Sequence, residues 1–345
     1  MLKSNTIKYS YNDIAVMPAA ISSIRHRSET NPFYDNDKLP IFTAPMSSIV
    51  NVDNISEYIN NHINVVIPRN IDIVDRFYYM SKYNCFAAVS MNEAEKYCFG
   101  KEKVFLRNEK INLCIDVANG HMKSLYDLVK RLKSEYTNIT IMTGNIANPE
   151  TIKYACEAGV DYIRIGIGTG AGCITSSNTA IHYPIASLID ECVKKRHKFG
   201  GKVKIIADGG IRNYNDVIKA LALGADYVMI GGLFATCLEA GLVYQFKNGL
   251  TFNSSCKDFH NDDLFHKFYG MASKEGMRDL GLKKHTAEGI SKFVKITQTI
   301  EGWANNMEDY LRSAMSYTGT TDIKYFKNNA TAILISGNTY QSVNK

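Results

Sequence analysis

Eight short, nearly continuous apolar runs recur along the chain, and most are followed by a turn and a segment with helically spaced apolar residues. Runs of this kind are typical of parallel strands that are buried on both faces. Strands that alternate with helices predict βαβ units. Eight of them favour a closed (β/α)8 TIM barrel, an α/β fold, over an open doubly wound sheet. The predicted strands are 40–46, 64–67, 85–89, 111–117, 139–143, 162–165, 203–207 and 227–230.

The length leaves room for more than a barrel. A (β/α)8 barrel takes about 250 residues, so roughly 95 of the 345 fall outside it. We expect an N-terminal arm over 1–39, an inserted hairpin and flap within 242–298 with its turn at Lys247-Asn248-Gly249, and a C-terminal helical extension that begins with a helix over 299–317. No linker separates two cores. The sequence therefore predicts a single domain over 1–345, with the barrel core at about 40–241 plus 299–319.

Composition excludes several function classes. The chain is 45% apolar and 21% charged, as expected of a globular protein and not of a disordered one. A net charge of +6 suits an anionic small molecule but is not the basic stripe of a nucleic-acid binder. The longest apolar stretch, Ala220–Leu238, is interrupted by Asp226 and glycines, so we expect no membrane span. The polar first residues predict no signal peptide.

The eight cysteines form no CxxC pair and no cluster with histidine. This scatter predicts reduced thiols, a cytoplasmic location and no structural metal site.

In (β/α)8 barrels the active site lies at the carboxyl ends of the strands. The predicted strand 162–165 is followed there by GIGTGAGCIT, residues 166–175. Its alternate glycines allow close backbone approach, and its N–H and carbonyl groups suit an anion or a cation. Cys173 is either a nucleophile on this loop or one more ordinary cysteine. The glycine spacing is not that of a dinucleotide-binding loop.

The last two predicted strands end in glycine pairs. Asp208-Gly209-Gly210 follows strand 203–207, and Gly231-Gly232 follows strand 227–230. Backbone N–H groups at these two positions suit a phosphate, and Asp208 suits a ribose diol. The alternative is that the glycines merely end the strands. Polar residues after strand 111–117, beginning with Asp116, are further candidates for ligand contacts.

Four segments, in this order and spacing, resemble the IMP dehydrogenase/GMP reductase family: GIGTGAGCIT at 166–175, IADGGIR at 206–212, GADYVMIGG at 224–232 and YGMAS at 269–273. The resemblance extends from Tyr11 to Gly319. It implies a (β/α)8 barrel that binds a purine nucleoside monophosphate, usually as a homotetramer.

The resemblance also implies roles for individual residues. Cys173 would attack purine C2 to form a covalent thioimidate, and Thr175 and Glu288 would form a proton-transfer pair. The backbone around Gly168, Gly170 and Cys173 would hold a monovalent cation such as K⁺. The implied substrate contacts are Met46, Asp208, Gly209, Gly210, Gly231, Gly232, Gly270, Met271, Ala272 and Gly289. The implied contacts to a nicotinamide cofactor are Arg27, Asp116, Val117, Ala118, Ser313 and Ser316, and the basic residues around Arg27 favour NADPH.

Two absences favour the reductase branch. The family's dehydrogenases usually carry CBS modules between early barrel elements, whereas Pro68–Cys85 passes directly between two strands here. Between Met271 and Glu288 the chain also has no Arg-Tyr pair, which dehydrogenases use to activate water. The resemblance thus implies NADPH-dependent reductive deamination of GMP to IMP and ammonia. The alternatives are an IMP dehydrogenase without CBS modules and a non-catalytic nucleotide-binding homologue.

Four positions depart from the family pattern. Ala171 replaces a serine that contacts phosphate, and Ser47 replaces an aspartate after Met46. Arg69 stands where reductases have a lysine, and His285 replaces an arginine before Glu288. Arginine does not deprotonate, so Arg69 would keep an electrostatic role but not a proton-shuttling one.

Overall fold

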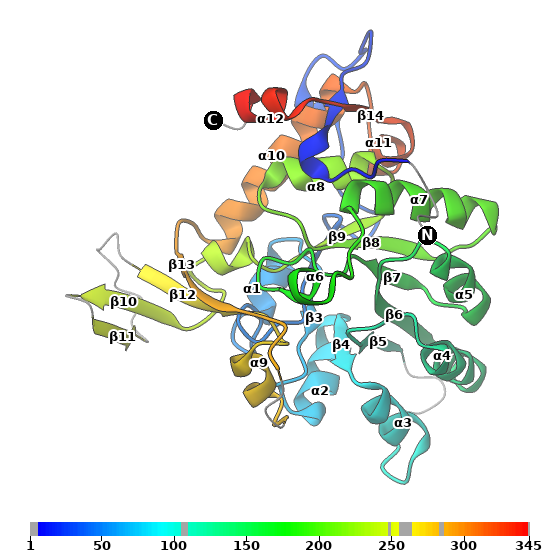
Figure 1. Ribbon diagram of the computed structural model, residues 1–345, viewed down its shortest axis with the longest axis vertical. Coiled ribbons are helices and arrows are strands. Elements are labelled where there is room, and N and C mark those ends of the chain that lie inside the picture. The colour runs from blue at the N-terminus through cyan, green and yellow to red at the C-terminus, as the bar shows by residue number, and fades with distance from the viewer. Residues whose placement is uncertain (1–5, 105–109, 248–249, 255–263, 283–285, 344–345) are drawn as a thin grey trace.

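Eight parallel strands form the centre of the molecule (Figure 1). The computed structural model describes residues 6–104, 110–247, 250–254, 264–282 and 286–343. All eight predicted strands are present, and the (β/α)8 barrel is confirmed. The strands are β2 (Ile41–Thr43), β3 (Val66–Ile67), β4 (Phe86–Val89), β5 (Ile111–Asp116), β6 (Ile139–Ile146), β7 (Tyr162–Ile165), β8 (Lys204–Asp208) and β9 (Tyr227–Ile230).

The first two barrel strands are shorter than the apolar runs that predict them. Each strand from β3 to β8 pairs with the next, and β9 pairs in parallel with β2. A single bridge between Phe42 and Asn64 joins the first two strands. Prolines limit the length of β2, because Pro40 and Pro45 flank this strand and have no N–H to donate to a ladder.

Helices surround the strands (Figure 1). The helices are α1 (Ile55–Asn60), α2 (Ile73–Tyr83), α3 (Met91–Phe99), α4 (Lys123–Glu135), α5 (Thr151–Ala158), α6 (Thr175–Thr179), α7 (Ile185–Lys198), α8 (Tyr214–Ala222), α9 (Lys274–Asp279), α10 (Ile300–Tyr317), α11 (Ile323–Asn329) and α12 (Gly337–Val343).

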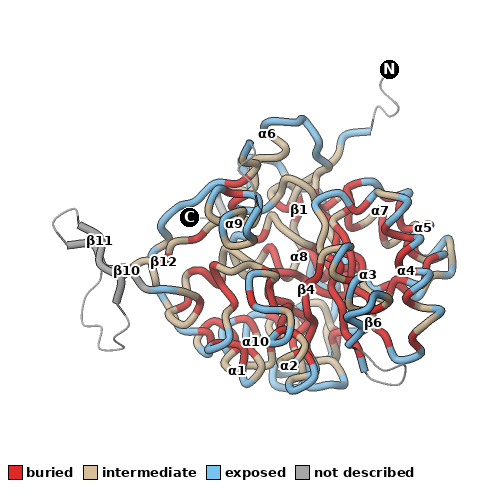
Figure 2. The backbone as a smooth tube through the Cα atoms, turned by 90° about the horizontal axis from the view of Figure 1, so that it is seen from below, coloured by how far each residue is buried: buried red, intermediate tan, exposed pale blue. Residues whose placement is uncertain are grey.

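Helix α10 is the last helix of the ring. It buries Trp303, Met307 and Leu311, which recur every four residues and so lie on one face. That face contacts α8 on one side and α1 on the other. The predicted helix 299–317 therefore completes the barrel, although the flap separates it from β9 in the sequence. Figure 2 shows the buried residues gathered inside the ring of helices.

The segments outside the barrel form two small sheets. Strand β1 (Ile14–Met17) of the arm pairs antiparallel with β14 (Thr331–Leu334), which ties the arm to the C-terminal extension. Strands β10 (Val243–Lys247), β11 (Leu250–Ser254), β12 (Leu264–Tyr269) and β13 (Ser291–Lys295) form an antiparallel sheet in the order β11-β10-β12-β13. Strands β10 and β11 form the predicted hairpin, while Asn248 and Gly249 of its turn lie outside the described residues.

The apolar stretch over 220–238 is divided, as predicted, among the end of α8, β9 and a 3-10 turn at Phe234–Thr236. Within the described residues, no helix is long and apolar enough to cross a membrane.

Candidate active site at the barrel mouth

Cys173 lies at the carboxyl end of the barrel, on the glycine loop after β7 and just before α6. Its thiol donates to Thr175 Oγ1 at 3.3 Å. Thr175 Oγ1 in turn donates to Glu288 Oε2 at 2.8 Å. The three side chains therefore form a continuous hydrogen-bonded chain from a half-buried thiol to a carboxylate. Such a chain can carry a proton between an atom bound next to Cys173 and Glu288.

Backbone contacts bring Glu288 to this loop. Cys173 and Gly289 form an antiparallel bridge, in which Ile174 N donates to Glu288 O at 2.9 Å and Ile290 N donates to Gly172 O at 2.9 Å. The approach is close enough to require glycine, because a Cβ at Gly289 would lie 2.8 Å from Ser273 N. Glu288 N also donates to Ala272 O at 3.1 Å. The loop that carries Cys173 is thereby joined to residues 288–290, and those to the segment that contains the predicted contacts Gly270, Met271 and Ala272.

Asp208 ends β8 and is held by two neighbouring strands. Its Oδ2 accepts from Arg164 Nε at 3.1 Å, from Arg164 Nη2 at 2.9 Å and from Asn145 Nδ2 at 2.8 Å. All of these donors bind one oxygen. Among the described residues none donates to Oδ1, so this oxygen has room for a further donor, and the ribose contact of Asp208 stays a prediction.

Arg164 is a site residue that the sequence reasoning missed. It extends from β7, is 8% exposed, and also donates from Nη1 to Asp116 Oδ1 at 2.6 Å. Burial opposes its charge, but the carboxylates of Asp208 and Asp116 outweigh burial and raise the pKa of Arg164. One buried guanidinium thus links a predicted substrate contact to a predicted cofactor contact. A signal was present in the sequence, because an arginine within the apolar run YIRI must find a charged partner when it is buried.

The glycine pairs after β8 and β9 lie near the cysteine loop. Gly209 and Gly210 have positive φ angles of 95° and 76°. Gly210 N donates to Thr169 O at 2.8 Å, so this N–H already has a partner. Gly231 and Gly232 have no hydrogen-bond partner for their N–H groups among the described residues, and these groups suit an anion.

The surroundings of Gly231 and Gly232 are apolar. A Cβ at Gly231 would lie 3.0 Å from Met46 Sδ, which places the predicted contact Met46 beside this glycine. A Cβ at Gly232 would lie 3.1 Å from Ala171 Cβ and 3.9 Å from the ring of Phe268. The departure at Ala171 therefore faces the predicted phosphate site, where it supplies a methyl group instead of a hydroxyl.

The predicted cation ligands are backbone carbonyl oxygens, which are the donor type that holds K⁺ in other proteins. Gly168 O accepts from Ser176 Oγ at 3.0 Å, and Gly170 O accepts from Cys173 N at 3.0 Å. A carbonyl oxygen has two lone pairs, so each keeps one for a cation. The donor set fits a monovalent cation in this respect. Within the described part of the chain, no group of three or more His, Cys, Asp or Glu side chains is placed to hold a metal ion.

The predicted cofactor contacts form two groups. Asp116 ends β5, and Val117 and Ala118 follow it. Ser313 and Ser316 lie on α10, and Arg27 reaches the same helix by an exposed ion pair with Asp309 at 3.2 Å. Because α10 packs between α8 and α1, it lies across the barrel from β5. No contact joins the two groups among the described residues.

The other three positions that depart from the family pattern are 69, 47 and 285. Arg69, which follows β3, forms an ion pair with Glu93 at 3.5 Å. Burial would raise the pKa of Glu93, but hydrogen bonds from Arg76 and Ser90 outweigh it and lower that pKa. Ser47 Oγ donates to Asp279 Oδ2 at 2.7 Å. His285 lies outside the described residues.

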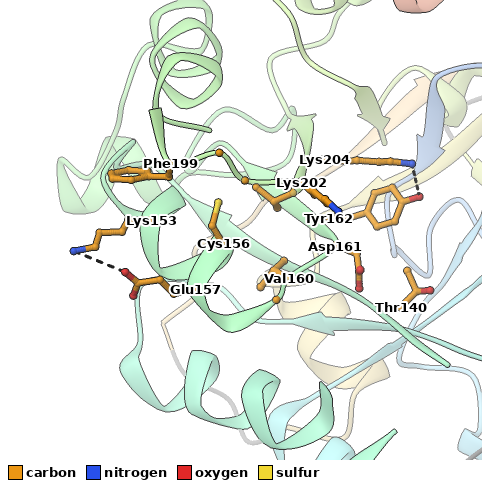
Figure 3. A pocket seen from close by; sticks show the side chains of 14 residues that line it. Thr140, Lys153, Cys156, Glu157, Val160, Asp161, Tyr162, Phe199, Lys202 and Lys204 are labelled. Atoms are coloured by element: carbon orange, nitrogen blue, oxygen red, sulfur yellow. Dashed lines mark hydrogen bonds and ion pairs between the residues drawn. The ribbon is translucent and has the colours of Figure 1, made fainter. Parts of the chain in front are cut away.

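One cavity, shown in Figure 3, lies away from this chemistry. It has a volume of about 740 Å³ and is lined by Lys153, Cys156, Phe199 and Tyr162, among others. Tyr162 and Lys204, which also line it, begin β7 and β8, so the cavity opens at the amino ends of the strands. None of the predicted site residues lines it. The positions of Cys173, Asp208 and Gly231 favour the opposite end of the barrel as the active site.

Comparison with known proteins identifies similar chains. A family model described as "IMP dehydrogenase / GMP reductase domain" matches residues 79–344. The chain is 33% identical to the GMP reductase of Caenorhabditis elegans over 237 residues, which cover 66% of this chain and 60% of that protein. It is 32% identical to the GMP reductase of Enterobacter sp. (strain 638) over 277 residues, 76% of either chain. It is 27% identical to GMP reductase 1 of Mus musculus over 355 residues, 96% of either chain.

Proposed function

The chain belongs to the IMP dehydrogenase/GMP reductase family, an enzyme family, and from this premise we propose that it is a GMP reductase. The proposed reaction is the NADPH-dependent reductive deamination of GMP to IMP and ammonia. The observation that carries the proposal is the hydrogen-bonded chain from Cys173 through Thr175 to Glu288. A nucleophile beside a proton relay is what removal of an amino group from purine C2 requires.

The proposed first step forms a bond between Cys173 Sγ and purine C2 and breaks the bond from C2 to the amino nitrogen. As this bond forms, the S–H bond of Cys173 breaks and its proton passes through Thr175 to Glu288. The amino group leaves as ammonia only after it gains a proton. Thr175 is placed to pass that proton from Glu288, since its hydroxyl contacts both the thiol and the carboxylate. The product of this step is a covalent thioimidate on Cys173.

NADPH, when bound, supplies the hydride that reduces C2. As C2 gains the hydride, the bond between Sγ and C2 breaks and its electron pair returns to sulfur. Cys173 then regains a proton, for which the Thr175 hydroxyl is the nearest group in the relay. The thiol is thereby ready for a second cycle.

We propose that Asp208 binds the ribose through Oδ1 and that the backbone N–H groups of Gly209, Gly231 and Gly232 bind the phosphate. Gly210 shapes this loop, because its own N–H is already donated. The remaining proposed substrate contacts, at the base, are Met46, Gly270, Met271, Ala272 and Gly289. The carbonyl groups of Gly168, Gly170 and Cys173 are the proposed ligands of K⁺.

The proposed cofactor contacts support an oligomer. Arg27, Ser313 and Ser316 lie across the barrel from Asp116, Val117 and Ala118, and we propose that the two groups contact different NADPH molecules. A second copy of the chain can supply the missing group, which agrees with the proposed homotetramer. Each copy is proposed to be a single domain without CBS modules, acting in the cytoplasm.

Turnover assays test the proposal. Purified protein is mixed with GMP and NADPH while NADPH absorbance and ammonia are followed, and a parallel reaction contains IMP and NAD⁺. We expect NADPH consumption and ammonia release in equal amounts. Turnover only with IMP and NAD⁺ would instead identify a dehydrogenase. Binding of GMP without turnover in either reaction would contradict both enzymatic functions.

A substitution tests the covalent step. Cys173→Ala should abolish turnover, since no bond to C2 can form, while GMP binding measured by calorimetry persists. Normal turnover by this variant would rule out the thioimidate.

A further inference from the structure

Three oxygen-bearing side chains from separate elements meet beside the proposed base-binding residues. The hydroxyl groups of Ser47 and Tyr269 each donate to Asp279 Oδ2, both at 2.7 Å. The two hydroxyl oxygens lie 3.3 Å apart. Ser47 follows β2, Tyr269 ends β12, and Asp279 ends α9, so this cluster joins the flap to a loop at the barrel mouth.

The cluster is connected to both methionines of the proposed site. Ser47 Oγ lies 3.8 Å from Met271 Sδ, and Ser47 is the chain neighbour of Met46. Met46 in turn lies beside Gly231, where a Cβ would be 3.0 Å from its sulfur. A displacement of Ser47 or of the flap therefore changes the position of Met46 or Met271.

Helix α9 packs directly against the backbone of Met271. A Cβ at Gly276 would lie 2.6 Å from both Gly270 O and Met271 Cα, so the helix packs on this backbone without an intervening side chain. The other side of α9 is held by an ion pair between Glu275 and Lys267 at 3.0 Å. The end of α9 that carries Asp279 reaches the loop after β2, because Asp279 accepts a hydrogen bond from Ser47.

The phenol of Tyr269 keeps its proton in this cluster. Burial and the neighbouring Asp279 carboxylate raise the pKa of Tyr269 to about 12, although the hydrogen bond with Ser47 opposes this. The phenol is therefore a donor throughout the neutral range. Hydrogen bonds to a charged acceptor are stronger than those between neutral groups, and this carboxylate receives two of them.

We propose that Asp279 is a positioning residue that latches the flap onto the loop after β2 and thereby sets the spacing of Met46 and Met271 around the purine base. This inference rests on the proposed function for its substrate, whereas the latch itself consists of contacts within the chain. Ser47 stands where the family pattern has an aspartate, so the carboxylate here comes from the flap instead of from the barrel loop.

Moving the carboxylate from position 279 to position 47 gives a direct test. Ser47→Asp would place two carboxylates at hydrogen-bond distance, and their repulsion would open the latch. Ser47→Asp combined with Asp279→Asn returns one carboxylate and one neutral partner, now with their positions exchanged. Asp279→Ala removes the acceptor altogether. Asp127→Ala is a matched control, because among the described residues this exposed carboxylate on α4 pairs with Lys123 alone, at 2.6 Å.

Two readouts separate the latch from the proposed function. Hydrogen exchange over residues 269–282, without nucleotide, should accelerate in Ser47→Asp and Asp279→Ala and return toward wild type in the double variant. Steady-state kinetics with GMP should show KM raised about tenfold in both single variants, with kcat changed less than about twofold, and KM largely restored in the double variant.

Several outcomes would overturn the latch. These are unchanged exchange in Asp279→Ala, a double variant no better than Ser47→Asp, or a loss of kcat with KM unchanged. A wild-type protein that does not reduce GMP contradicts the proposed function alone, because the exchange measurement needs no substrate. Melting curves of all four variants verify that each is folded.

Discussion

Arg164→Met tests the electrostatic centre of the barrel mouth. The guanidinium is 8% exposed and forms ion pairs with Asp208 at 2.9 Å and Asp116 at 2.6 Å. Methionine has a similar length but no charge, so the variant leaves two carboxylates facing each other without the cation between them.

The expected destabilisation follows from this geometry. Removing one partner of a buried ion pair costs about 3–5 kcal/mol. The lower end applies here, because Asp208 and Asp116 are 15% and 21% exposed and retain some contact with water. For 345 residues the entropy of unfolding is about 0.7 kcal/mol per kelvin, so a loss of about 3 kcal/mol lowers Tm by about 4 °C.

Differential scanning calorimetry measures the shift, with Arg131→Met as the control. Arg131 pairs with Glu95 at 3.5 Å on the surface, where both side chains are more than half exposed, so its loss should leave Tm nearly unchanged. Arg164→Met should also bind GMP more weakly, since Asp208 loses two of its three donors. A Tm within about 1 °C of wild type, together with unchanged GMP affinity, would refute the assignment of Arg164 as the group that holds Asp208.

Three further predictions concern the proposed reaction and the fold around it. Glu288→Gln should slow ammonia release more than the hydride step, because the relay loses its acid; equal slowing of both in stopped-flow measurements would contradict that role. Gly289→Ala should lower kcat/KM, since a Cβ there would meet Ser273 N at 2.8 Å, whereas Gly337→Ala, with no atom within 4 Å, should not. At mildly alkaline pH, iodoacetamide should modify half-buried Cys173 well before Cys114, because burial raises the pKa of the Cys114 thiol to about 12; peptide mapping that found Cys114 modified first would show that the thiol is accessible.

The barrel could be predicted from the sequence because its signal is local. Buried parallel strands carry continuous apolar runs, and the eight runs correspond to β2–β9. Helices α6 and α9 were not predicted, since TSSNT and KEGMRD are short, polar and without an apolar period. The pairing of β1 with β14 was not predicted either, because nothing in either strand identifies a partner at the other end of the chain.

The candidate site also contains residues that could be predicted from local sequence and residues that could not. Cys173, Asp208 and the glycine pairs follow predicted strands, so barrel geometry alone places them at one end. Glu288 could be placed only through the family resemblance, because its contact with Thr175 spans the whole flap. Arg164 carried a local signal, a charge within an apolar strand, but its two partners lie on other strands and no spacing rule connects them.

Two of the departures from the family pattern, Ser47 and Ala171, lie beside the proposed substrate contacts and are not part of the proposed relay. Ser47 donates to the carboxylate of Asp279, so the contact between the barrel loop and the flap is made here with its charge on the flap. At Ala171 the described residues offer no such replacement: Ala171 and Phe268 place apolar groups next to Gly232, so the proposed phosphate contact would depend on backbone N–H groups. Cys173, Thr175 and Glu288 keep their hydrogen-bonded order. Because Ser47 and Ala171 lie beside proposed substrate contacts and leave the proposed relay in place, we expect these two departures to be expressed in KM for the nucleotide and in its salt dependence, and not in kcat.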